Sequence, residues 1–181
     1  MTDSASALSS WATFYAIVGS SGGALVGLQF VVITLVADKR DRVAEGSLGA
    51  FGTPTVVHLT SALVVSAIMS APWPSLVPLS TVLALCGLGG LAYGAMVVRR
   101  ARRQKDYEPV WEDWLWHAGL PCVSYAALTV MAVVLGTRPQ FALSVIGAVA
   151  LGLLLIGIHN AWDTVVYITV TGSDGDTTRT D

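Results

Sequence analysis

Residues 46–98 read GSLGAFGTPTVVHLTSALVVSAIMSAPWPSLVPLSTVLALCGLGGLAYGAMVV and contain no Asp, Glu, Lys or Arg. This uncharged run is long enough to cross a membrane twice, because one helical crossing needs about 20 apolar residues. The stretch 71–75, APWPS, holds two prolines and supplies a turn between the two crossings. The run therefore predicts transmembrane helices at about 51–70 and 75–98, the first with Thr53 and Pro54 in its opening turn.

Three further uncharged stretches flank this run, and they predict spans at about 8–37, 120–136 and 141–168. The chain is 54% hydrophobic and only 12% charged, whereas soluble domains average about 25% charged residues. A chain of 181 residues leaves no room for a sizeable soluble domain beside these spans. We therefore expect an all-α integral membrane bundle of five transmembrane helices over 1–171, followed by a flexible cytoplasmic tail at 172–181.

The segment 107–117, YEPVWEDWLWH, differs in kind from the spans. It is rich in tryptophan, a residue type that gathers at the level of the lipid headgroups. We expect a short interfacial helix at about 108–117, separated from the fourth span by a break at Gly119 and Pro121.

The basic residues predict the orientation of the bundle. With five spans, nine of the ten Lys and Arg residues fall on one side, in the segments 39–42, 99–105 and at Arg179, and only Arg138 lies opposite. The positive-inside rule places the basic side in the cytoplasm. The sequence thus predicts a cytoplasmic-membrane protein with its N-terminus outside and its C-terminus inside.

The first span carries glycines at intervals of four residues, at Gly19, Gly23 and Gly27. This spacing keeps them on one stripe of the helix, where another backbone can approach closely. The stripe fits packing inside the monomer as well as an interface between subunits, and the second interpretation predicts a homo-oligomer.

Polar residues inside spans are costly, and they usually face a bundle interior. Here the expected topology gathers nearly all of them in the cytoplasmic half. His159 and Asp163 are four residues apart and share a helix face, and Asp113 and His117 repeat this spacing. With His58, they form a candidate set of metal ligands for a divalent ion, because imidazole and carboxylate groups bind such ions together. Three further residues are expected to support the set: Gln29, Ser61 and Asn160.

Several functions fit this polar set. It could bind a metal or another cation, carry protons or ions through a homo-oligomeric channel, or form only a structural hydrogen-bond network. A metal-activated water could also hydrolyse a lipid, with Ser61 or Asp113 assisting, although no catalytic residue is assigned. An accessory subunit of a larger membrane complex is the remaining alternative. The chain carries no P-loop, dinucleotide fingerprint, nucleophile elbow or nucleic-acid motif, so we expect the lipid bilayer and no nucleic acid among its partners.

Several stretches resemble a group of small uncharacterised bacterial multi-pass membrane proteins. They include GLQFV at 27–31, FGTPTVVH at 51–58, EDWLWH at 112–117 and IHNAWD at 158–163. The resemblance covers most of the chain and implies a multi-span helical fold. It implies no activity.

Overall fold

The computed structural model describes the backbone of residues 8–37, 45–101 and 111–177, and the side chains of 8–34, 54–100, 111 and 114–166. Within these ranges the protein is helical, and no strand occurs. The helices, in chain order, are α2 (Ala12–Ala37), α3 (Glu45–Ser70), α4 (Leu76–Ala101), α5 (Trp111–Trp114), the π-helical turn η2 (Leu115–Gly119), α6 (Leu120–Val134) and α7 (Pro139–Thr177).

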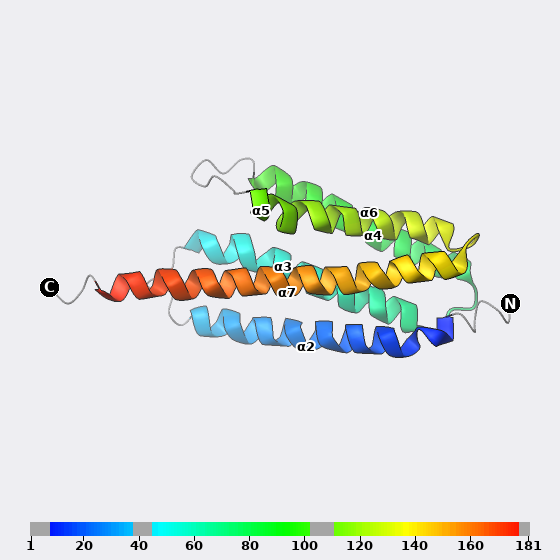
Figure 1. Ribbon diagram of the computed structural model, residues 1–181, viewed down its shortest axis with the longest axis horizontal. Coiled ribbons are helices and arrows are strands. Elements are labelled where there is room, and N and C mark those ends of the chain that lie inside the picture. Colours follow the sequence, from blue (N-terminus) through cyan, green and yellow to red (C-terminus); the bar gives the residue numbers. More distant parts are fainter. Residues whose placement is uncertain (1–7, 38–44, 102–110, 178–181) are drawn as a thin grey trace.

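The five long helices lie along one common axis and alternate in direction (Figure 1). Helices α2, α4 and α7 run one way, and α3 and α6 run back. The extensive contacts join α2 to α3, α3 to α7, α7 to α6 and α6 to α4, whereas α3 and α4 touch only slightly. Helix α7 therefore lies between two helix pairs and connects them.

Four of the described helices contain segments long and apolar enough to cross a membrane, at Ala12–Thr34, Leu76–Arg100, Leu115–Val134 and Pro139–Val166. Helix α3 contributes the shorter apolar segment Pro54–Ser70. Large apolar side chains also cover the outside of the bundle, among them Phe30, Val77 and Val133. Contiguous exposed apolar surface of this kind is rare on soluble monomers, so the fold is compatible with a membrane protein.

Helix boundaries differ from the sequence-based expectation at two places. Helix α3 begins at Glu45, so Pro54 lies inside the helix and not in its first turn. A proline removes one backbone hydrogen bond, a loss that helices in membrane bundles can tolerate. Helix α7 continues through Thr177, and residues 172–177 belong to it, because extending an existing helix costs far less than starting one. Residues 178–181 of the expected tail lie outside the described range.

The expected break before the fourth span is also wrong. The chain passes from α5 through η2 directly into α6, and the Leu120 N–H donates to the Leu115 carbonyl five residues back. Pro121 lies in the first turn of α6, but because the chain is already helical before it, its missing N–H leaves one carbonyl of the preceding turn without its helical donor. A regular helix would press the proline ring against the carbonyl of His117, four residues earlier, and the wider π turn is a conformation that eases this clash. Residues 108–110 of the expected interfacial helix lie outside the described range.

The glycines of α2 pack mainly inside the monomer. A Cβ atom on Gly19 would lie 3.0 Å from Cβ of Ser66, and one on Gly22 would lie 3.1 Å from the Leu59 carbonyl oxygen, both on α3. A Cβ on Gly23 would meet only ordinary contacts, and one on Gly27 would meet nothing within 4 Å. The N-terminal part of the stripe thus lies against α3, and self-association through this helix stays a prediction.

Two adjacent glycines of α4 allow a direct test of this packing. A Cβ on Gly90 would overlap the ring of Tyr125 on α6, whereas one on Gly89 would point into open space. We expect Gly90→Ala to lower the free energy of unfolding by about 1–3 kcal/mol through overpacking. Gly89→Ala should raise it by up to about 1 kcal/mol through helix propensity. Unfolding of both variants in detergent, followed by circular dichroism, measures the difference, and equal stability would contradict the close α4–α6 contact.

Candidate functional site

A chain of hydrogen bonds joins α3 to α6 in the interior of the bundle. The His58 ring is 2% exposed, and its Nδ1 lies 3.0 Å from the hydroxyl of Tyr125. The same hydroxyl lies 2.9 Å from Oγ of Ser61, which in turn donates to the carbonyl of Val57 at 2.8 Å. These residues form one continuous network across the α3–α6 interface.

Only one arrangement of protons satisfies all three contacts. A carbonyl oxygen can only accept, so the single hydroxyl proton of Ser61 goes to Val57. Ser61 Oγ must then accept from the Tyr125 hydroxyl, and that hydroxyl oxygen must accept from Nδ1–H of His58. This direction places the proton of a neutral His58 on Nδ1 and leaves a lone pair on Nε2.

The Nε2 atom of His58 has no hydrogen-bond partner among the described residues, although it is fully buried. The side chain of Asn160 on α7 is 0% exposed, and its amide nitrogen and oxygen likewise have none there. Gly157 of α7 lies against Leu59, the residue after His58. Asn160 follows three residues later, about 4.5 Å along the helix. His58 and Asn160 thus lie within about one helical turn of each other in depth.

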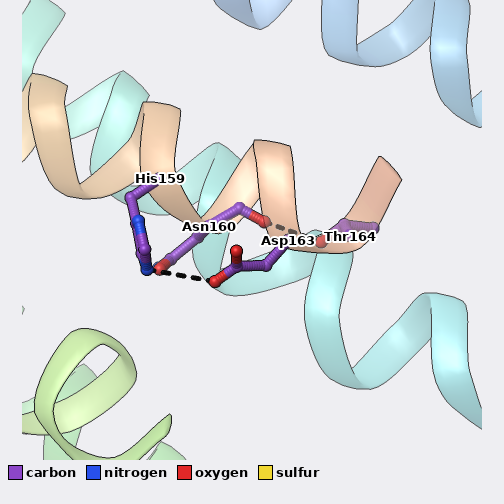
Figure 2. A network of polar contacts seen from close by, with 4 residues as sticks. All are labelled: His159, Asn160, Asp163 and Thr164. Carbon is purple, nitrogen blue, oxygen red and sulfur yellow. Dashed lines mark hydrogen bonds and ion pairs between the residues drawn. The ribbon is translucent and has the colours of Figure 1, made fainter. Parts of the chain in front are cut away.

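His159 and Asp163 form an ion pair on the side of α7, with 3.1 Å between Nε2 and Oδ2 (Figure 2). Both are partly exposed, by 35% and 47%. The indole of Trp116 in η2 stacks on the His159 ring, with 3.8 Å between the centroids and 26° between the planes. The hydroxyl of Thr164 donates to the Asn160 carbonyl on the same helix (Figure 2). The pair therefore occupies the margin of the bundle beside the buried Asn160.

The structure does not form the expected shared metal site within the described residues. No group of three or more His, Cys, Asp and Glu side chains lies close enough to hold one ion there. Nδ1 of His58 and Nε2 of His159 are each paired with another protein group, Tyr125 and Asp163 respectively. His117 is half-buried in η2, and the side chain of Asp113 is not among the described ones.

Two of the expected supporting residues belong to this region, and one has no described contact with it. Ser61 is part of the hydrogen-bond chain. The fully buried Asn160 lies on α7, at a depth in the bundle similar to that of His58. Gln29 is half-buried on α2, and no contact joins it to this network among the described interactions.

Sequence reasoning missed Tyr125 and Trp116, the residues that determine how the histidines lie. Tyr125 is the one tyrosine of the apolar stretch 120–136, and its hydroxyl could have marked it there as a hydrogen-bond partner. The stacking of Trp116 on His159 depends on the π turn, which no sequence pattern indicated. Buried polar atoms also occur elsewhere in the core, at Tyr15 and Ser66.

Comparison of the chain with protein-family models, with curated proteins and with solved structures finds no match. The resemblance to small bacterial multi-pass membrane proteins stays a prediction.

Proposed function

We propose that the chain crosses the cytoplasmic membrane five times. Helices α2 and α4 run in the same direction (Figure 1), so the chain must cross back through α3 if both are spans. The exposed Arg99 and Arg100 end α4, and Arg138 precedes α7 at the opposite end of the bundle. The positive-inside rule then favours a cytoplasmic location for the α4 end and an external one for the α6–α7 turn.

Cysteine labelling of intact cells tests this orientation, in a background that lacks Cys86 and Cys122. A membrane-impermeant maleimide should label a cysteine placed at Thr137 and spare one placed at Arg102, because only the first is outside. Permeabilised cells should show labelling at both positions, as the control. Labelling at Arg102 in intact cells would contradict the orientation.

We further propose that the bundle binds a cation in its cytoplasmic half, between α3 and α7. The observation that carries this proposal is the buried lone pair on Nε2 of His58, which no described residue satisfies. An unsatisfied buried acceptor costs about 1–3 kcal/mol, and the cost is higher where the surroundings are hydrocarbon. An occupant that offers a positive charge or a hydrogen-bond donor removes that cost.

The nearby groups favour a cation over an anion. The amide oxygen of Asn160 is a second buried acceptor at similar depth, and Asp163 places a carboxylate at the margin. Because three ionisable metal ligands do not converge among the described side chains, the chemistry fits a cation that brings its own hydrogen-bond donors. A protonated amine and a metal ion that keeps its water shell both meet this requirement.

Calorimetric titration of the purified protein with Mg²⁺, which usually keeps several of its waters, and with methylammonium tests the proposal and separates the two kinds of cation. One of them should bind the native chain, and His58→Ala should weaken that binding about tenfold or more, the effect of losing one charge-assisted hydrogen bond. Asn160→Leu should weaken it similarly and leave thermal stability unchanged or raised, because Leu has a similar volume and no polar atoms.

Ser66→Ala is the matched control, because Ser66 is a buried polar residue on the same helix, two turns from His58, whose hydroxyl also has no described partner. It should leave cation binding unchanged. If neither cation binds the native chain, or if all three variants bind equally well, the proposal is wrong and the network has a structural role. Asn160→Leu keeps the test decisive should His58→Ala fail to fold.

A further inference from the structure

The slight contact between α3 and α4 leaves a cleft of about 270 Å³ on the side of the bundle. Helix α3 forms one wall from Val56 to Val65, Cys86 of α4 forms the other, and Tyr125 and Leu128 of α6 close the back. The cleft is half-open, and Val64 at its edge is 39% exposed. In a membrane, its open side faces lipid.

Two of the polar groups that border the cleft, the Tyr125 and Ser61 hydroxyls, require nothing from an occupant. The Tyr125 and Ser61 hydroxyls bind each other, and their remaining donor and acceptor capacity goes to His58 and Val57. The remaining lining is mostly valine and leucine. A cavity of this kind favours a hydrocarbon occupant over water, which would need two to four polar partners.

The cleft has the length and direction of a lipid chain. Residues 56–65 rise by about 14 Å along the helix axis. This length is close to half of the roughly 30 Å hydrocarbon core of a bilayer. Because the long helices share one axis (Figure 1), a cleft along α3 runs parallel to the acyl chains of one leaflet.

Charge at the end of the same helix wall identifies the kind of lipid. Arg100 follows Cys86 by fourteen residues, which is about 21 Å along α4, and lies within about 40° of it around the helix, whereas Arg99 lies on another face. This distance matches a half-core of about 15 Å plus a headgroup layer of about 5–7 Å. Arg99 and Arg100 are both exposed, so they lie at the depth where an anionic phosphate would be held.

We propose that the cleft between α3, α4 and α6 binds one acyl chain of an anionic phospholipid from the leaflet on the Arg99 side. This inference rests on the proposed membrane insertion and is independent of the proposed cation site. The apolar walls hold the chain, and Arg100, on the Cys86 side of α4, binds the phosphate. A lipid in this position fills the space that the weak α3–α4 contact leaves open.

Native mass spectrometry of the full chain in mild detergent tests the proposal, with phosphatidylglycerol and phosphatidylcholine of identical chains as probes. One molecule of phosphatidylglycerol should bind to each chain, and more tightly than phosphatidylcholine.

Val64→Phe fills the cleft and should weaken binding at least about tenfold, since several methylene groups lose their burial. Val133→Phe makes the same change on the outer face of α6, away from the cleft, and should have no effect. Arg100→Gln should reduce the preference for phosphatidylglycerol about fivefold, and Arg99→Gln, on another face of α4, should reduce it less.

Equal lipid binding by the Val64 and Val133 variants would overturn the proposal. It would also be overturned if Val64→Phe changed the oligomeric state while lipid binding stayed constant, because the occupant would then be a second copy of the chain. Cation binding should persist in Val64→Phe, so failure of the lipid site and failure of the cation site are separate results. Recovery of the native chain in the soluble fraction without detergent would instead contradict membrane insertion.

Discussion

Polar atoms in the interior of this bundle can find partners only within the protein or in a bound molecule, because the outer faces of the helices are apolar. The chain from His58 through Tyr125 to Ser61 meets this constraint for Nδ1 of His58 and for both hydroxyls, down to the carbonyl of Val57. In this network each group donates its proton to the next, from His58 to Tyr125, then to Ser61 and finally to the carbonyl of Val57. The consequence is a lone pair on the far side of the His58 ring, at the depth of the unsatisfied Asn160 amide. Both the α3–α6 contact and the proposed cation site follow from this one direction of donation.

Helix α7 determines where this chemistry can occur. In the most apolar 18-residue segment of α7, 56% of the residues are buried, against 17% in the corresponding segments of α2 and of α4. Gly157 lets α3 approach closely on one side, and α6 packs along the other. Since α7 separates the pair α2–α3 from the pair α4–α6, consecutive helices α3 and α4 are held apart at their outer edge. The lateral cleft is therefore a consequence of the same packing that buries Asn160.

Much of the fold could be predicted from the sequence, because charge-free stretches of sufficient length have few alternatives to apolar helices. The α-helical class, the turn at 71–75 and the burial of His58 follow from that pattern and agree with the structure. His159 and Asp163 were expected to face the interior as well, but they lie partly exposed at its margin. The helix ends were harder, since Pro54 and Pro121 mark breaks in isolated helices but are accommodated here by an early start and a π turn. Convergence of the histidines could not be read from spacing within single helices. It depends on rotations between helices, and these direct His58 to Tyr125 and His159 to Trp116.

The protonation of the His58 ring is the most direct test of this account, and ¹⁵N NMR of the histidine-labelled protein in lipid measures it. His58→Gln identifies the signals of this residue. At a pH where the ring is neutral, the account predicts a proton on Nδ1 and none on Nε2, and Tyr125→Phe should weaken this preference by removing the acceptor. A proton on Nε2 in the native chain would reverse the hydrogen-bond direction, remove the buried lone pair and contradict the account.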